Sequence, residues 1–203
     1  LLARANRRVL IANDINLLDP GVATHVAQAL DSRQVGVERE GISIVHDADF
    51  VLVGVFNSEG SEPSWLLRDR VGLIVDAAVD WSPDETAEII ERSVEFDNDP
   101  VSFVERFSKE TAQLISEIKD ARARLPRIRL SKTQVRHISQ VALRLGVEGN
   151  RADLFAFKAA RANAALAGRV EVTEDDLVAA IQFVLVPRAT ERPAPEERGE
   201  GRE

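Results

Sequence analysis

Two polar side chains stand where apolar stretches of the sequence end. Asn57 follows the run Phe50–Phe56, and Arg70 follows the apolar residues Trp65–Leu67. An amide can hydrogen-bond a phosphate oxygen or an attacking water, and a guanidinium stays charged and offers two parallel donors to phosphate oxygens. Nucleotide-hydrolysing proteins use a γ-phosphate sensor and an arginine finger of these chemical types. The sequence therefore predicts Asn57 as a sensor, and Arg70 as a finger that acts in trans on the nucleotide of a neighbouring subunit.

A degenerate acidic pair follows another apolar run. Val9–Ala12 leads directly into Asn13 and Asp14. Hydrolysis of a nucleotide needs an acidic pair at a strand end, which holds Mg²⁺ and polarises water. Asn13 takes the place of the metal-holding Asp but brings no charge, and Asp14 takes the place of a longer Glu. The phosphate-binding pattern G-x-x-x-x-G-K-[ST] is absent from these residues. We interpret the strand end as a decayed hydrolytic site.

Each candidate also has an ordinary structural interpretation. Asn and Asp are common turn residues after strands, which would explain every candidate at a strand end. Arg70 would equally suit a surface ion pair with Asp69 or Glu62. Arg151 opens a predicted helix, where the macrodipole disfavours a cation. It is a candidate second sensor that reaches over bound phosphates, unless Asp153 simply neutralises it.

The elements that must carry these residues alternate between strands and helices up to Asp76. Short apolar runs predict strands buried on both faces, Glu40-Gly41 predicts the turn of a β-hairpin at about 34–47, and Asp19-Pro20 predicts a helix start. Strands that alternate with helices indicate a parallel α/β sheet. The predicted strands outside the hairpin are Val9–Ala12, Phe50–Val55 and Gly72–Val75, and the predicted helix ends near Asp31.

Beyond residue 80 the pattern is helical. Ser82 and Ser131 begin capping boxes, Thr173 caps the last helix, and Gly146 and Gly168 mark helix ends. The expected domains are residues 1–80 (the C-terminal part of an α/β core), 81–186 (a helical domain) and 187–203 (a disordered linker rich in Pro and Glu). The predicted helices cover residues 82–95, 101–124 in one or two pieces, 131–145, 151–166 and 173–185.

Composition limits the remaining possibilities. The chain has 203 residues, no Cys and a net charge of −8. This excludes disulfides and thiolate metal sites, and it argues against a broad nucleic-acid surface. No apolar run approaches the roughly 20 residues of a membrane span, and the three His show no metal-ligand spacing. The sequence begins at Leu1 and lacks Met, so we expect a fragment of a longer protein.

Together these segments resemble the AAA+ module of the magnesium-chelatase and cobaltochelatase family. The combination is specific, although each segment alone is weak. It implies a P-loop AAA+ type parallel sheet, here lacking its N-terminal part, followed by an all-helical lid with Arg151 as the second sensor. The resemblance rests on residues 1–18 around the acidic pair, 37–43 in the hairpin, 53–57, 67–73, 121–126 and 149–154.

Departures from the family's pattern favour one type of its subunits. The catalytic I subunit has an intact acidic pair where this chain has Asn13 and Asp14, and the tail from Arg192 resembles the Pro-rich acidic linker of the family's D-type subunit. The resemblance therefore favours a D-type subunit that hydrolyses little or no ATP. It implies Mg²⁺ insertion into protoporphyrin IX for (bacterio)chlorophyll synthesis, in the bacterial cytoplasm or plastid stroma, driven by ATP hydrolysis in I subunits.

The resemblance also implies partners and cofactors. The partners are the AAA+ I subunit and a large porphyrin-binding subunit, with the AAA+ modules in a homo- or hetero-hexameric ring. ATP and Mg²⁺ belong at the subunit interface, whether or not this chain binds them itself. Two alternatives remain open: an active ATPase motor of the same family, and a related AAA+ chaperone that remodels metalloenzymes without touching tetrapyrrole.

Overall fold

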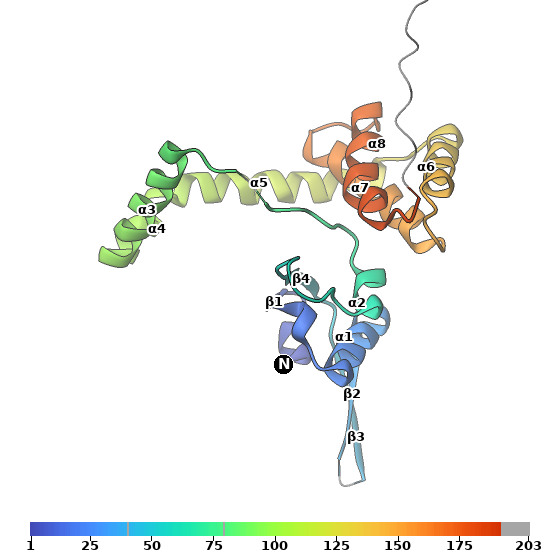
Figure 1. Ribbon diagram of the computed structural model, residues 1–203, viewed down its shortest axis with the longest axis horizontal. Helices are drawn as coiled ribbons and strands as arrows, with labels where there is room; N and C mark the ends of the chain where they lie inside the picture. Colours follow the sequence, from blue (N-terminus) through green and yellow to red (C-terminus); the bar gives the residue numbers. More distant parts are fainter. Residues whose placement is uncertain (40, 79, 192–203) are drawn as a thin grey trace, which may run out of the picture. The chain divides into compact units, whose positions relative to one another are not determined.

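The computed structural model describes residues 1–39, 41–78 and 80–191. The chain divides into two compact units, Leu1–Gly72 and Leu73–Glu203, which we call the N-terminal and C-terminal units. Figure 1 colours them along the sequence from blue to red.

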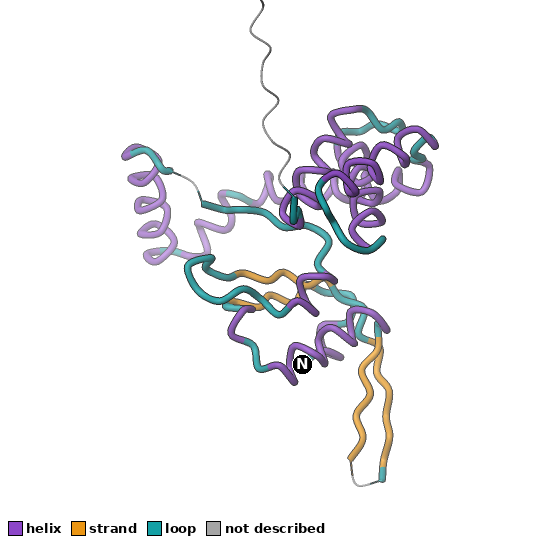
Figure 2. Tube along the Cα trace, turned by 45° about the vertical axis from the view of Figure 1, so that its right-hand side comes forward, coloured by secondary structure: helices purple, strands orange, loops and turns teal. Residues whose placement is uncertain are grey.

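A parallel pair of strands forms the centre of the N-terminal unit. β1 pairs with β4, with Val9 opposite Val51 and Asn13 opposite Val55, so the predicted parallel sheet is confirmed. β2 and β3 form the predicted antiparallel hairpin, seen as a narrow ribbon in Figure 2. The elements of this unit are η1 (Leu2–Ala5), β1 (Val9–Asn13), η2 (Ile15–Leu17), α1 (Pro20–Ser32), β2 (Gln34–Arg39), β3 (Ile42–Asp47), β4 (Val51–Val55) and α2 (Trp65–Arg70).

Burial of the sheet on both faces was predicted and is wrong. Leu10, Ala12 and Leu52 are partly buried, and Ala12 and Leu52 pack against a core that includes α1 and α2. On the opposite face Ile11 is 65% exposed and Val51 is 59% exposed. The reason is that the helices of this unit cover one face of β1 and β4. In the described part of the chain, alternate apolar residues along each strand therefore have no covering element.

The predicted strand Gly72–Val75 is also wrong. Residues 71–78 form no strand. The backbone N–H of Ile74 donates instead to the carbonyl of Phe183 at 2.9 Å, within the C-terminal unit. A short apolar run is compatible with either arrangement, because periodicity does not reveal which backbone partner it will find.

Gly54 in β4 permits a close approach of the residue that follows the acidic pair. A Cβ at Gly54 would lie 2.6 Å from Cδ1 and 3.1 Å from Cγ2 of Ile15, which is only 4% exposed. We expect Gly54→Ala to lower the free energy of unfolding by about 1–3 kcal/mol, because Ile15 must leave its packed position. Denaturant titration measures this. Gly36→Ala is the control, since nothing lies within 4 Å of its added Cβ; equal effects of the two changes would contradict the packing argument.

Among the described residues of the C-terminal unit, the regular elements are all helices, as predicted, and one isolated β-bridge joins Arg129 to Glu171. The long α5 leads into a bundle in which α7 packs against α5, α6 and α8 (Figure 1). Its elements are α3 (Pro83–Asn98), α4 (Pro100–Arg106), α5 (Ser108–Arg124), η3 (Leu125–Arg127), α6 (Lys132–Arg144), α7 (Arg151–Leu166), α8 (Glu174–Ala180), the π-helical η4 (Ile181–Leu185) and η5 (Val186–Arg188). The predicted capping boxes at Ser82 and Ser131 are confirmed, and Thr173 is the N-cap of α8, as predicted.

Small residues hold the bundle together. Ala152, Ala156, Ala160 and Ala164 recur every fourth residue of α7, and each is at most 5% exposed. Residues four apart share one face of a helix, so this face lets neighbouring helices approach closely.

The beginning of the expected disordered linker is ordered. Pro187 lies in η5, and the N–H groups of Thr190 and Glu191 donate to the carbonyl of Leu145 at 3.0 and 3.1 Å. Thr190 Oγ1 donates to the carbonyl of Gly146 at 2.7 Å. These bonds satisfy carbonyls at the end of α6, which explains why the chain is fixed here. The remainder of the linker, from Arg192 on, lies outside the described residues.

Candidate functional site

Three of the candidate residues meet at one edge of the sheet. Asn13 ends β1 opposite Val55, and Asn57 follows β4 two residues later. Because the strands are parallel, their carboxyl ends share this edge, and Asn13, Asp14 and Asn57 are all exposed there. We call it the carboxyl edge. In open α/β sheets this is where ligands bind.

Asp14 occupies an unusual backbone conformation. Its φ and ψ are 51° and 44°, in the left-handed region that Asp tolerates better than most residues. Its carbonyl accepts the N–H of Leu17 at 2.8 Å, which starts η2. The turn interpretation of the sequence is therefore realised in the backbone, while the exposed carboxylate remains available at the carboxyl edge.

Asn57 also takes part in a turn. Its Oδ1 accepts the N–H of Glu59 at 3.0 Å. This uses the acceptor end of the amide, whereas a γ-phosphate sensor uses the Nδ2 donor end. The structural role and the proposed sensing role therefore involve opposite ends of the same side chain.

Asn16 is a further polar residue at this edge that the sequence analysis did not select. Its Oδ1 is buried and has no hydrogen-bond partner among the described residues. Asn16 Nδ2 lies 3.4 Å from where a Cβ on Gly60 would stand, so the side chain lies against the loop that follows Asn57. A buried acceptor without a partner costs about 1–3 kcal/mol, which makes Asn16 a candidate contact for a bound group. The only sequence signal was an amide directly after a buried Ile.

Arg70 is held by an ion pair that the sequence analysis did not foresee. Its Nε donates to Asp31 Oδ2 at 2.7 Å, its Nη2 lies 2.6 Å from the same oxygen, and its Nη1 donates to the Leu66 carbonyl at 2.9 Å. The foreseen partner Asp69 is 4.0 Å away. The other foreseen partner, Glu62, bonds Arg68 instead. The Arg70 side chain is 17% exposed, so it is well ordered but largely enclosed.

The position of Arg70 separates it from its own carboxyl edge. α1 begins beside that edge after Asp19 and ends near Asp31, and its 13 residues span about 20 Å. The far end of α1 lies at the amino ends of the strands, where the carbonyl of Arg33 accepts the N–H of Ala48 at 2.8 Å. Arg70, bonded to Asp31, therefore lies too far away to reach a phosphate at the carboxyl edge of the same chain.

Arg151 is the first residue of α7 in the C-terminal unit. The preceding Asn150 makes no side-chain capping bond. Asp153 Oδ1 is buried without a hydrogen bond from any described residue, and burial raises the pKa of this carboxyl. The first turn of α7 thus combines a cation with a carboxyl that is poorly solvated.

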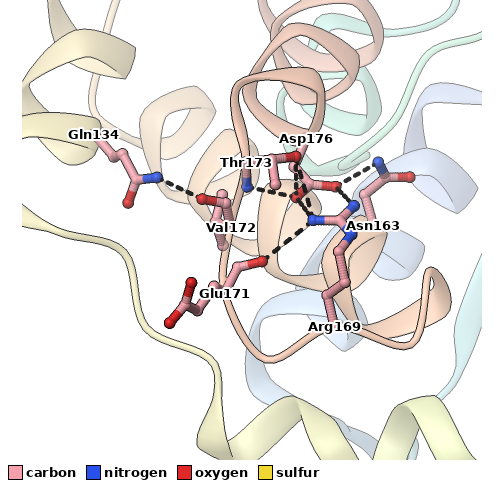
Figure 3. A network of polar contacts seen from close by, with 7 residues as sticks. All are labelled: Gln134, Asn163, Arg169, Glu171, Val172, Thr173 and Asp176. Atoms are coloured by element: carbon pink, nitrogen blue, oxygen red, sulfur yellow. Dashed lines mark hydrogen bonds and ion pairs between the residues drawn. The ribbon is translucent and has the colours of Figure 1, made fainter.

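The helical bundle that carries Arg151 contains an ionic network around the buried Asp176 (Figure 3). Asp176 is fully buried, and its oxygens accept bonds from Arg169 at 2.6 and 2.8 Å, from Asn163 Nδ2 at 2.8 Å and from the Thr173 N–H at 2.8 Å. The Arg169 guanidinium is the main reason that the pKa of the Asp176 carboxyl lies well below its usual range; the bonds from Thr173 and Asn163 add to this, against the opposing effect of burial. The network ties α7 to the start of α8.

These groups differ in what they can bind. Among residues 1–39, 41–78 and 80–191, no group of three or more acidic or His side chains is arranged to hold a metal ion. Of the residues Asn13, Asp14, Asn16 and Asn57 at the carboxyl edge, Asp14 alone is a carboxylate. This does not fit the acidic pair that Mg²⁺ bound to ATP requires. Arg70, in contrast, carries a guanidinium that fits a phosphate oxygen.

Comparison with known proteins defines the fold class. The family model described as AAA lid domain matches residues 135–203. A solved structure from Cytophaga hutchinsonii ATCC 33406, described as a candidate ATPase, superposes with a TM-score of 0.63 at 14% identity, covering 89% of this chain and 58% of that one. The chain is therefore part of an AAA+ α/β core followed by a helical lid.

Relatives in sequence narrow the class. The chain is 38% identical to the magnesium-chelatase 67 kDa subunit of Chlorobaculum parvum and 38% identical to the magnesium-chelatase subunit ChlI of Anabaena variabilis, over 95% of its own length in each case. It is 36% identical to a ChlI homologue of Methanocaldococcus jannaschii. The chain is thus similar in sequence to magnesium-chelatase subunits. It spans 30%, 57% and 53% of these three relatives respectively.

Every helix in the part of the chain that the structure describes is too short or too polar to serve as a membrane span.

Proposed function

We propose that this chain is the AAA+ part of a D-type subunit of magnesium chelatase. In this role it assembles with ATP-hydrolysing I subunits and a large porphyrin-binding subunit, in cytoplasm or plastid stroma. It couples ATP hydrolysis to the insertion of Mg²⁺ into protoporphyrin IX. The names of the relatives support the chelatase assignment, and identity is the same 38% to a 67 kDa subunit and to a ChlI subunit. The choice of the D type over the I type therefore rests on Asn13 and Asp14.

The strand-end residues explain weak hydrolysis. Asn13 provides at most one neutral oxygen ligand, so it contributes no charge to offset that of Mg²⁺. Asp14 is one methylene shorter than Glu, so its carboxylate reaches less far towards an attacking water. A misplaced or missing general base typically costs a factor of about 10²–10⁴ in rate. The chain therefore contributes little to hydrolysis at its own carboxyl edge.

Arg70 supports the proposed role in trans. A finger stabilises the charge that develops on a neighbour's phosphate, and it needs no acidic pair of its own. Arg70 lies at the opposite end of α1 from the carboxyl edge, which fits a residue that serves another protomer's nucleotide. The bonds that Arg70 donates to Asp31 hold the guanidinium in a fixed orientation before assembly. In the assembled ring Arg70 would share its donors between Asp31 and the phosphate.

A hydrolysis assay tests this proposal. We expect the purified natural protein to hydrolyse ATP at least about 100-fold more slowly than a catalytic I subunit under the same conditions. Restoring the acidic pair with Asn13→Asp and Asp14→Glu should raise any residual rate, while Asn57→Ala should lower it. A wild-type protein that hydrolyses ATP alone as fast as the I subunit would refute the proposed role.

An active motor subunit is the second candidate, favoured by the equal identity to the ChlI relative. In that case Asp14 holds the metal in a shifted register, and the natural protein carries a G-x-x-x-x-G-K-[ST] loop. Fast hydrolysis by the isolated protein would support it. Gene deletion distinguishes a related chaperone from both chelatase subunits. Protoporphyrin IX accumulates in the deletion strain only if the protein serves the chelatase.

A further inference from the structure

The helical hairpin formed by α3 and α4 has a surface of apolar side chains that remain exposed. α3 has no buried residue, and Ile90 and Val94 are 58% and 53% exposed. They line an open hollow of about 480 Å³ together with Glu91, Glu95, Asn98 and Asp99. Contiguous exposed apolar surface with a polar rim is characteristic of a protein interaction site. We call this surface the α3 hollow.

The hairpin is well held despite its exposure. Phe96 of α3 packs edge to face on Phe103 of α4 at 5.6 Å between ring centroids, and Phe103 contacts Phe107 at 4.9 Å. Arg106 Nη1 donates to both carboxylate oxygens of Glu95 at 2.6 Å and lies over the Phe107 ring. The α3 hollow is therefore fixed before any partner binds, which lowers the entropic cost of binding.

The α3 hollow is strongly acidic. Within α3 the acidic residues outnumber a single basic one, Arg92, which bonds Glu88, and Arg106 of α4 pairs with Glu95. Glu91 lines the hollow and forms no ion pair among the described residues. An occupant must therefore combine apolar and basic side chains. The acidic residues within Pro83–Asn98 are Asp84, Glu85, Glu88, Glu91, Glu95 and Asp97.

α6 of the same unit carries the complementary surface. One face of the helix carries Lys132, Arg136 and Leu143. Arg136 follows Lys132 by four residues and Leu143 follows Arg136 by seven, which are spacings that keep side chains on the same face. Leu143 is 76% exposed, Lys132 and Arg136 are exposed, and α6 contains no acidic residue. Neither cation forms an ion pair within the described ranges. We call this surface the α6 face.

The two surfaces cannot meet within one chain. The hairpin joins the start of α5, whereas α6 follows its end through η3. α5 is one continuous helix of 17 residues and spans about 25 Å. Its C-terminal half packs on the bundle, so the helix keeps the α3 hollow away from the α6 face of its own chain.

We propose that the α3 hollow of one copy of this chain docks on the α6 face of a second copy, head to tail. Such a heterologous contact leaves one free hollow and one free face on every pair, so it propagates into a ring or filament. A contact between two helices of this length is small, so we expect it to be weak alone and sensitive to salt. This inference goes beyond the proposed function, because it needs neither nucleotide nor porphyrin.

Charge reversal gives a test with an internal rescue. The hollow variant carries Glu88→Lys and Glu91→Lys, and the face variant carries Lys132→Glu and Arg136→Glu, all at exposed positions. The natural protein is studied by analytical ultracentrifugation at low salt without nucleotide. We expect wild type to self-associate, and each variant alone to associate about 10- to 100-fold more weakly because like charges then face each other. The two variants mixed should associate again, since each hollow then meets an oppositely charged face.

Three results would overturn the proposal: a monomeric wild type that binds only a purified I subunit, self-association that neither reversal weakens, or a mixture that stays monomeric. Reversal of two exposed acids on the β2–β3 hairpin, Glu38→Lys and Asp47→Lys, is the control for net charge and should leave association unchanged. Circular dichroism melting confirms that each variant is folded. Because the readout is mass in solution, its failure is distinguishable from failure of the chelatase assignment.

Discussion

Arg70→Ala is expected to reduce ATP hydrolysis by about 10³- to 10⁵-fold at those active sites of the assembled complex that this chain completes. The guanidinium offsets charge that develops on the transferred phosphoryl group, and Ala supplies no donor. The rate is measured with saturating I subunit, which provides the nucleotide site. The rate of I subunits measured without this chain is the baseline, because the substitution is absent from them.

A matched control lies on the same helix. Arg68 is two residues away and bonds exposed Glu62 at 3.2 Å, so Arg68→Ala removes an equal charge from α2. We expect its effect on hydrolysis to be less than about twofold, because surface ion pairs contribute little. Asp31→Asn weakens the ion pair of Arg70 but keeps the guanidinium, which separates loss of fold from loss of the finger. If Arg70→Ala lowers only the melting temperature and leaves hydrolysis per assembled complex intact, the finger assignment is wrong.

Asp176→Ala is expected to lower the free energy of unfolding of the lid by about 3 kcal/mol. Asp176 is 0% exposed and accepts bonds from several donors, so its removal leaves the Arg169 guanidinium and the Asn163 amide without their acceptor. The Arg169 side chain is 36% exposed, so water can solvate its guanidinium in the variant. The expected loss of unfolding free energy therefore lies at the lower end of the range for breaking a buried ion pair. Urea denaturation followed by far-ultraviolet circular dichroism measures the change.

The neighbouring carboxylate provides the control. Asp175 is exposed, and we expect Asp175→Asn to change stability by less than about 0.5 kcal/mol. A similar loss for both variants would mean that overall charge, and not the buried network, stabilises the lid.

Acid should weaken the same network. The pKa of the Asp176 carboxyl is lower in the folded chain than its unfolded value of about 3.9, mainly because of Arg169. Its stabilising contribution is therefore complete above that unfolded value and is lost as the pH falls towards the folded value. Wild type should lose stability between about pH 5 and pH 2 more steeply than Asp176→Asn. Equal slopes for the two proteins would contradict this.

The local order of elements could be predicted from the sequence because each start and stop has a local cause. Ser82 and Ser131 cap helices through their own side chains, Asp176 accepts the N–H of Thr173 at the start of α8, and Asp19 with Pro20 begins α1. The parallel pairing of β1 with β4 follows from the intervening helix. The meeting of Asn13 with Asn57 at one edge follows from that pairing alone.

Long-range partners could not be predicted in this way. Asp31 is 39 residues from Arg70, and the sequence offered two nearer carboxylates for the same ion pair. Ile74 gives its N–H to Phe183, a bond between distant residues that no local pattern encodes. Burial of β1 on both faces was wrong for a similar reason, since apolar composition does not state which element covers a strand.

The central claim is that this chain lends Arg70 to a neighbour's nucleotide while its own strand end, at Asn13, no longer holds the metal. The most direct test is an electron cryomicroscopy structure of the natural protein assembled with I subunits and a non-hydrolysable ATP analogue. The account predicts the Arg70 guanidinium within hydrogen-bond distance, about 3 Å, of a γ-phosphate oxygen bound to the adjacent protomer. A ring in which Arg70 still bonds only Asp31, remote from every nucleotide, would contradict it.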